Sequence, residues 1–334
     1  YSGGATCPSL LLEPSRTNLL PQSEYYLSGG WVINSGTLTT NYAVSPEGLQ
    51  NASKINFTSG GEIVRTTSFT AGQAYTFSFY AKVESGTFDF TYGNINYTLT
   101  SGTATTEWQR FEITQTAPVA SRYPKIDATN TGDLLIWGFQ IEQGSYPTSY
   151  IPTYGVSQTR ALDNCLKTGV SSLIGQSNGT LFVEVGVFPK ETNGRIFGIS
   201  DGSTNKYIII IKNSTNTDFA VYVTNNGGQV TYQGTGSLND NSKIAVGYAN
   251  NDYVIYVNGT QVHTDTSASV PTCSNIYVGQ RENGSGTYVA GGSVKQALLF
   301  KTRLSNLDLA ILTGATTYNT FAAMALALNY TVYE

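Results

Sequence analysis

Apolar and polar residues alternate along most of this chain, which is the spacing of β-strands that bury one face. The clearest segment is LLIWGFQIE at 134–142, in which one alternate set is Leu135, Trp137, Phe139 and Ile141. We predict a strand here, with that set facing a core. Gly144 and Pro147 follow and end the strand, because neither residue continues a ladder well.

The segments before this strand repeat the pattern in shorter form. Alternation predicts strands at 52–57, 61–67, 74–83, 88–92, 97–100 and 108–114. Clusters rich in Gly, Ser and Asn lie between them and predict turns. Regular short strands with this punctuation favour a sandwich, so we assign residues 1–160 to one jelly-roll β-sandwich.

A second β-domain is predicted after a junction. We assign residues 161–177 to a linker and 178–316 to a second sandwich, because alternation resumes in GTLFVEVGVF at 179–188. The pair Asn258-Gly259 lies between two alternating segments and favours a two-residue hairpin, since both turn positions need positive φ. The predicted fold class is all-β, with two tandem antiparallel β-sandwiches.

Helical spacing appears only near the C-terminus. Ser305 is a predicted N-cap, with an acidic residue three positions on. Residues 317–334 are predicted to form a short helix and tail, with Phe321, Met324 and Leu328 on one apolar face. A helix of about ten residues is marginal alone in water, so this face needs a partner surface. We predict that it contacts another chain; the alternative is that it packs on its own sandwich.

Composition and charge exclude several functions. Charged residues make up 12% of the 334 residues and the net charge is −4, so nothing attracts nucleic acid or anionic lipid. No apolar run reaches membrane-spanning length, so we expect no membrane insertion. No charged-then-apolar leader is visible. The chain starts at Tyr1 without Met, which is expected of a processed product, a fragment or part of a longer protein.

The sequence contains no recognisable motif for catalysis or metal binding. Cys7, Cys165 and Cys273 match no metal pattern; free thiols are favoured, with a Cys7–Cys165 disulfide as the alternative. The single histidine, His263, argues against a His-based metal site and a Ser-His-Asp triad. No strand carries the alternate acidic pair of a glycosidase. We therefore predict no catalytic residue, no metal ligand and no enzymatic activity.

Several motifs carry a resemblance to known families. SLLLEPSRTNLL at 9–20, IWGFQIEQG at 136–144, YPTSYIPT at 146–153 and TRALD at 159–163 resemble a module of bacteriophage and prophage tail fibres, head fibres and related adhesion proteins. An early Trp, YTFSFYAKV, WQRFEIT and LLIWGFQIEQG occur in an order similar to that of jelly-roll carbohydrate-binding modules. YVIYVNGTQV and ALLFKTRLSNLDLAIL resemble concanavalin A-like, laminin-G-like sandwiches over about 179–313.

The resemblance implies a function as well as a fold. It implies a non-enzymatic virion protein, on a phage tail or head fibre outside the cell, that attaches to host-surface glycans. The implied partners are other virion proteins and that glycan, and fibres of this kind are commonly homotrimers. Both fold families often bind Ca²⁺, for which Asp89 and Asp201 are candidates in residue type alone. The alternatives are a purely structural or decorating virion protein and, third, a polysaccharide depolymerase.

Glycan binding requires exposed aromatic rings beside amides and charged groups. Trp108 and Trp137 lie among apolar strand partners and are predicted to be core. The candidate glycan-binding residues are Trp31, Tyr92, Tyr97, Tyr123, Tyr207, Tyr232, Arg281, Asn283 and Tyr288. For Trp31 the alternative is a core position, and for the others it is inert surface.

Overall fold

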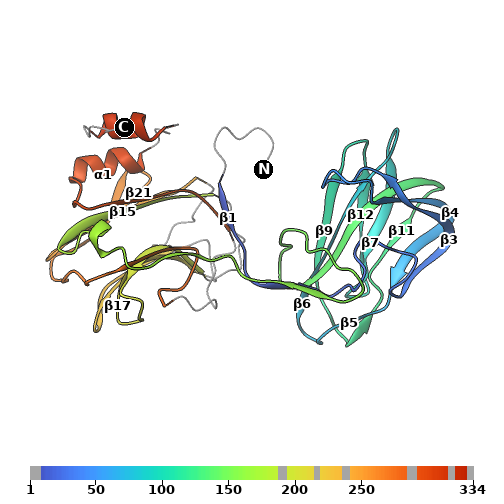
Figure 1. The fold of residues 1–334 in the computed structure, drawn as a ribbon, viewed down its shortest axis with the longest axis horizontal. Coiled ribbons are helices and arrows are strands. Elements are labelled where there is room, and N and C mark those ends of the chain that lie inside the picture. The colour runs from blue at the N-terminus through green and yellow to red at the C-terminus, as the bar shows by residue number, and fades with distance from the viewer. Residues whose placement is uncertain are drawn as a thin grey trace. The chain divides into compact units, whose positions relative to one another are not determined.

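The computed structural model describes residues 9–186, 194–213, 219–234, 241–283, 292–314 and 320–328. The chain is 54% strand and 6% helix, which confirms the all-β fold class with a short helical element near the C-terminus. It divides into two compact units, each a β-sandwich (Figure 1). The first sandwich is Ser15–Ala161. The second comprises the chain from Leu162 onward and the N-terminal segment that ends at Pro14.

The N-terminal boundary differs from the expected one. The sequence pattern assigns residues 1–160 to one domain, but β1 (Leu10–Leu12) pairs antiparallel with β24 (Gly292–Phe300) of the second sandwich. The predicted linker 161–177 likewise contains β14 (Cys165–Lys167), which pairs with β23 (Asn275–Val278). A three-residue strand is defined by partners far away in sequence, so local alternation does not reveal it.

The first sandwich is a curled antiparallel sheet with short accessory pairs. Its strands are β2 (Arg16–Asn18), β3 (Trp31–Ala43), β4 (Ala52–Arg65), β5 (Thr67–Ser68), β6 (Ala74–Lys82), β7 (Phe88–Gly93), β8 (Leu99–Ala104), β9 (Gln109–Thr116), β10 (Ser121–Arg122), β11 (Lys125–Ala128), β12 (Gly132–Gln143) and β13 (Gln158–Arg160). The main order is β8-β7-β11-β4-β12-β6-β9, with β3 beside β4; β5 pairs with β10 and β2 with β13. The rings of Phe90 on β7 and Phe111 on β9 lie 5.0 Å apart, so both ends of the order meet across one core.

Strand β12 lies in the middle of this sheet, and its phase differs from the prediction. The core-facing set is Leu134, Ile136, Phe139 and Ile141. A β-bulge follows Trp137, where Gly138 adopts φ +67°, a conformation that favours glycine. The bulge resets the phase, so Leu135 and Trp137 are buried outside this core cluster. The predicted alternation is therefore right after the bulge and wrong before it.

Four buried polar side chains, which we call the polar latch, close the first sandwich: Asn18, Gln140, Glu142 and Thr148. Asn18 Nδ2 donates to the backbone oxygen of Ile151 at 2.9 Å, and Gln140 Oε1 accepts from the N–H of Ile151 at 2.6 Å. The Glu142 carboxylate accepts from Gln140 Nε2 at 2.6 Å and from the N–H of Thr148 at 2.9 Å. The segments 9–20, 136–144 and 146–153, which carry the family resemblance, thus meet in one buried network.

The second sandwich has two facing antiparallel sheets around one core. Besides β1, β14, β23 and β24, its described elements are η1 (Ser171–Leu173), β15 (Asn178–Val185), β16 (Gly194–Ser200), β17 (Lys206–Lys212), β18 (Phe219–Asn225), β19 (Gly228–Gln233), β20 (Lys243–Ala249), β21 (Asp252–Val257), β22 (Thr260–Asp265), α1 (Asn306–Thr313) and α2 (Phe321–Ala327). The sheet orders are β1-β24-β15-β20-β21-β22 and β14-β23-β16-β17-β18-β19. The predicted hairpin joins β21 to β22, with φ +47° at Asn258 and +84° at Gly259.

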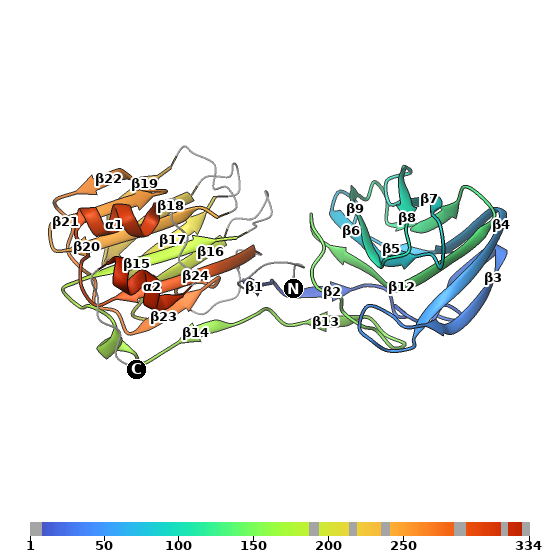
Figure 2. The same ribbon diagram turned by 90° about the horizontal axis from the view of Figure 1, so that it is seen from above.

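Helices α1 and α2 cover the outer face of the sheet that contains β20 and β21 (Figure 2). Ser305 is the N-cap of α1, as predicted, and its hydroxyl accepts from the N–H of Asp308 at 3.1 Å. Thr320 caps α2 in the same way, accepting from the N–H of Ala323 at 3.1 Å. Both helices therefore begin at residues whose side chains satisfy an otherwise unpaired backbone donor.

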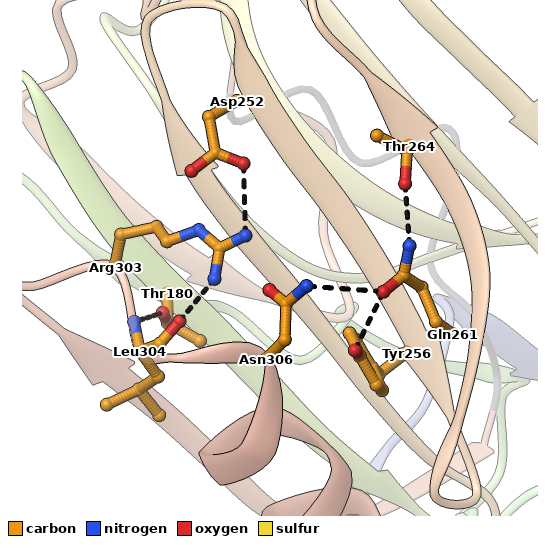
Figure 3. Close-up of polar contacts among 8 residues, drawn as sticks. All are labelled: Thr180, Asp252, Tyr256, Gln261, Thr264, Arg303, Leu304 and Asn306. Carbon is orange, nitrogen blue, oxygen red and sulfur yellow. Dashed lines mark hydrogen bonds and ion pairs between the residues drawn. The ribbon is translucent and has the colours of Figure 1, made fainter.

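Polar contacts fix the start of α1 on this sheet (Figure 3). Arg303 Nη2 donates to Asp252 Oδ1 on β21 at 3.0 Å. The N–H of Leu304 donates to Thr180 Oγ1 on β15 at 3.0 Å. These bonds reach two different strands, so the N-terminus of α1 is anchored before the apolar contacts beneath the helix begin.

The apolar face of α2 packs within its own unit. Met324 and Leu328 are 3% and 4% exposed and share a cluster with Tyr256 and Leu309. The prediction that they contact another chain is wrong for these two residues, and the alternative of packing on their own sandwich holds. Only the backbone of Phe321 is described, so its side chain stays untested. The homotrimer also stays a prediction.

Candidate functional site

A tight turn between β7 and β8 presents Tyr97 at the surface of the first sandwich. The N–H of Asn94 donates to the backbone oxygen of Thr98 at 2.8 Å and closes the turn. Asn94 and Tyr97 both adopt φ +71°. Asn tolerates this left-handed conformation, but it is uncommon for an aromatic residue. Strain of this kind persists where the surroundings hold it, and it gathers at functional sites.

Buried groups hold this turn in place. Ile95 is fully buried, and its N–H donates to Gln115 Oε1 at 2.8 Å. Gln115 Nε2 donates to both the backbone oxygen and Oγ1 of Thr98, each at 3.0 Å. Gln115 lies on β9 and is itself buried, so its amide is committed to the turn. The Tyr97 ring is therefore carried by a fixed support.

Arg122 joins Tyr97 to Tyr123. Its guanidinium carbon lies 3.7 Å from the centroid of the Tyr97 ring and 5.7 Å from that of Tyr123, within the range of cation–π attraction. Arg122 Nη2 donates to Asn94 Oδ1 at 3.0 Å, and Asn94 Nδ2 donates to the backbone oxygen of Tyr123 at 3.1 Å. We call these four residues, Asn94, Tyr97, Arg122 and Tyr123, the Tyr97 patch.

The patch sets exposed rings beside polar donors. Tyr97 is 59% exposed and Tyr123 is 48% exposed, whereas Arg122 is buried. Arg122 Nε has no hydrogen-bond partner among the described residues. The two rings offer flat apolar faces with a polar hydroxyl at the edge. Flat apolar surface with a few oriented polar groups is the composition of a site for a small hydroxylated ring.

Trp31 and Tyr92 do not belong to this patch. The Trp31 ring stacks on Phe139 at 4.8 Å, and its Nε1 donates to the backbone oxygen of Gln22 at 2.9 Å. Tyr92 is buried in the same core, which raises the pKa of its hydroxyl, and that hydroxyl donates to the backbone oxygen of Glu112 at 3.1 Å. Both rings serve the core, so Tyr92 is wrong as a predicted glycan contact, and for Trp31 the core position holds.

The two described tyrosine candidates of the second sandwich each pack against other side chains. Tyr207 is half-buried against an apolar cluster that includes Ile209. Tyr232 packs against the rings of Phe219 at 5.6 Å and His263 at 5.2 Å. His263 on β22 is therefore packed beside a ring, in line with its reading as an ordinary strand residue. Neither tyrosine presents a ring as exposed as Tyr97.

Among the remaining candidates, Arg281 contacts a buried acid. Glu282 is 3% exposed, and its carboxylate accepts from Arg195 Nε at 3.1 Å and from Arg281 Nε at 3.4 Å. Arg281 is thus engaged in an ion pair. Asn283 is exposed beside it, and Tyr288 lies outside the described residues. Glycan contact by Asn283 and Tyr288 stays a prediction.

Sequence reasoning missed half of the Tyr97 patch. Tyr97 and Tyr123 were predicted, but Arg122 and Asn94 were not. The Gly93-Asn94 pair is a visible turn signal, and Arg122 directly precedes Tyr123. Strand β10, however, is two residues long and has no period of its own. Only its pairing with β5 places Arg122 beside the turn.

The two aspartates considered for calcium make local hydrogen bonds. Asp89 Oδ1 accepts from Thr103 Oγ1 at 2.6 Å, and Asp201 Oδ1 accepts from the N–H of Ser203 at 2.8 Å. Within the described ranges, no three His, Cys, Asp or Glu residues gather as a metal would need. Calcium stays a prediction of the resemblance. None of the described helices is both long and apolar enough to cross a membrane.

Comparisons with known proteins give distant likenesses only. No family model and no curated protein matches the chain. The Ruminococcus gnavus IT-sialidase CBM40 bound to α2,3-sialyllactose is similar at 15% identity and a TM-score of 0.39, over 46% of this chain and 94% of that chain. A mutant of the NanB sialidase from Streptococcus pneumoniae is similar at 18% identity and a TM-score of 0.38, over 45% of this chain and 26% of that chain.

A third similar structure is the heptameric SAP-like pentraxin from Limulus polyphemus, at 9% identity and a TM-score of 0.34, over 47% of this chain and 76% of that chain. Likenesses this distant carry no functional argument. The function of this chain therefore has to be argued from its own side chains.

Proposed function

We propose that this chain is a non-enzymatic glycan-binding protein and that the Tyr97 patch is its contact with the sugar. One observation carries the proposal: two exposed tyrosine rings lie within cation–π distance of one buried arginine, on a turn held by a buried glutamine. A pyranose ring stacks its C–H face on such a ring, while its hydroxyls accept from amide and guanidinium N–H groups.

Pre-organisation favours this reading. Binding loses affinity when loops and long side chains must be ordered on contact. In the Tyr97 patch the turn is already fixed by Gln115, and Arg122 is already placed by Asn94 and by stacking on Tyr97. Binding of a ligand to this surface therefore requires little further ordering of the protein.

We propose further that the glycan belongs to a host surface and that the chain is part of a phage tail or head fibre. This role is supported by the resemblance of segments 9–20 and 136–163, and the glycan contact is supported by the geometry of the Tyr97 patch. A purely structural or decorating virion protein is the alternative.

A glycan-array screen of the full chain tests the contact. The best-binding glycan is then titrated against Tyr97→Ala and Tyr123→Ala. Because aromatic anchors commonly contribute more than 2 kcal/mol, we expect each variant to bind about tenfold or more weakly. Tyr25→Ala is the matched control, since Tyr25 is 47% exposed in the same sandwich but lies outside the patch.

Two results would overturn the proposal. If the intact chain binds no glycan, the structural or decorating role is favoured. If it releases reducing ends from a host polysaccharide, the chain is a depolymerase and the non-enzymatic reading is wrong. Equal losses in Tyr97→Ala and Tyr25→Ala would move the contact away from the Tyr97 patch.

A further inference from the structure

The first sandwich also contains a pocket of about 590 Å³. It is lined by residues of three segments: the start of β2, the residues that lead into β6, and the residues that follow β12. Those used below are Arg16, Thr17, Gln73, Gln143, Gly144 and Ser145. No Asp or Glu is among the lining residues. We call this the Arg16 pocket.

Arg16 lines the pocket, and the residues around it there include no carboxylate. Its guanidinium carbon lies 5.2 Å from the centroid of the Tyr146 ring. Its Nε is buried and donates to no partner among the described residues, and no Asp or Glu lines the pocket. A guanidinium in such surroundings has five donors to offer and no acceptor of its own. It is therefore poised for an anion.

Backbone geometry makes room for that guanidinium. Gly144 has φ +148°, and a Cβ there would lie 2.8 Å from Arg16 Nη2. A side chain at this position would thus displace the arginine. Gly144 is fixed from both sides, because its N–H donates to the backbone oxygen of Ala74 at 2.9 Å and its oxygen accepts from Thr76 Oγ1 at 2.9 Å. The backbone around Gly144, just after β12, thus fixes the space that the Arg16 guanidinium occupies.

The rest of the lining suits hydroxyl groups. Gln143 Nε2 donates to Gln73 Oε1 at 3.3 Å, which leaves the second amide hydrogen of Gln143 and the amide group of Gln73 for a ligand. Thr17 and Ser145 also line the pocket, and the Thr17 hydroxyl shares a hydrogen bond with the Thr159 hydroxyl at 2.8 Å. Cation, amides and hydroxyls together are complementary to a molecule that carries both a carboxylate and several hydroxyls.

We propose that the Arg16 pocket binds an acidic sugar, with the guanidinium of Arg16 on its carboxylate and the Gln73 and Gln143 amides on its hydroxyls. Arginine pairs with carboxylates through two parallel N–H···O bonds, which a lysine does not reproduce. Gln143 of the pocket pairs with Tyr75 on β6, and Tyr75 pairs with Gln115, which holds the Tyr97 turn. The pocket shares no residue with the Tyr97 patch, so the two sites are tested separately.

Isothermal titration calorimetry of the full chain with D-glucuronate, D-glucose and acetate tests this site. We expect glucuronate to bind at least about tenfold more tightly than glucose, which lacks the carboxylate, or acetate, which lacks the hydroxyls. Arg16→Gln is expected to weaken glucuronate binding by about tenfold or more. Arg16→Lys is expected to weaken glucuronate binding by less than Arg16→Gln does, because lysine keeps the charge but lacks the planar guanidinium.

Two controls keep the result specific. Lys301→Gln removes the same charge from an exposed position in the second sandwich and is expected to leave glucuronate binding unchanged. Tyr97→Ala is also expected to leave it unchanged, which separates this site from the proposed function. An unaltered melting temperature in Arg16→Gln shows that the fold is intact.

The proposal is overturned by any of three results: no glucuronate binding by the intact chain at millimolar concentration, equal binding of glucose or acetate, or full binding by a folded Arg16→Gln variant.

Discussion

Each sandwich covers part of a sheet with a non-strand segment, but the two covers use opposite chemistry. In the first sandwich, the segment 144–153 lies over β12, where the ring of Tyr150 is 4.4 Å from that of Trp137 and the polar latch ties the segment down. In the second, α1 and α2 cover the sheet through an apolar cluster that includes Leu309, Leu312 and Met324.

The difference teaches how each cover fails. A buried polar network is stable only when every member has its partner, because each orphaned group bears its full desolvation cost. An apolar cover loses stability in proportion to the area and volume removed, and neighbouring side chains relax partly into the gap. We therefore expect the first cover to fail as a unit and the second to weaken by degrees.

Removal of Asn18 from the polar latch should have the largest effect. Its side chain donates to the backbone oxygens of Phe139 and Ile151 and accepts from the N–H groups of Leu20 and Ile141. Asn18→Ala leaves these buried groups unpaired, so we expect the first sandwich to lose about 4 kcal/mol of unfolding free energy.

Urea unfolding followed by tryptophan fluorescence measures this loss. All three tryptophans, at positions 31, 108 and 137, lie in the first sandwich, so the signal reports that unit alone. Asn34→Ala, which removes an exposed asparagine bonded to Glu62, is the control and should cost under about 1 kcal/mol. A loss of similar size in both variants would mean that the latch is not a cooperative unit.

Replacement of Met324, on the buried face of α2, by alanine should have a smaller, local effect. Met324→Ala leaves a cavity in the apolar cluster, which costs about 2 kcal/mol. We expect amide hydrogen exchange in the peptide that covers α2 to become roughly 30-fold faster. Leu326→Ala on the same helix is the matched control, because Leu326 is 76% exposed and its loss should change exchange little. Equal acceleration in both would contradict packing of α2 through Met324.

The smallest expected effect is the dependence of the first cover on pH. Tyr150 donates to Glu24 Oε1 at 2.8 Å, and burial raises the pKa of Glu24, with the nearby Glu47 adding to the shift. The folded state thus holds this proton to higher pH than the unfolded chain does, so stability falls as pH rises through that window. Urea midpoints at about pH 4 and pH 7 should show wild type losing stability relative to Glu24→Gln as pH increases. A constant difference between the two chains would show that Glu24 does not couple the cover to pH.

Part of the candidate site was within reach of the sequence. Exposed tyrosines near predicted turns identified Tyr97 and Tyr123, but the same reasoning selected Tyr92, whose ring is in the core. Alternation does not show which alternate set faces inward, and Arg122 lies in a two-residue strand that is too short to have a period. The Arg16 pocket had no sequence signal at all, because its walls come from three segments far apart in the chain.

The sequence by itself determined the all-β class, the hairpin at Asn258-Gly259 and the N-cap at Ser305. These features depend on period, positive φ and capping, which act over a few neighbouring residues. The tertiary structure alone decided the phase of β12 before its bulge, the pairing of β1 with β24, the burial of Met324 on its own unit and the meeting of Arg122 with Tyr97. Each of these depends on contacts between residues far apart in the chain. For the strands, a one-residue shift of register turns a side chain to the other face, and for α2 the helix has to meet its sheet.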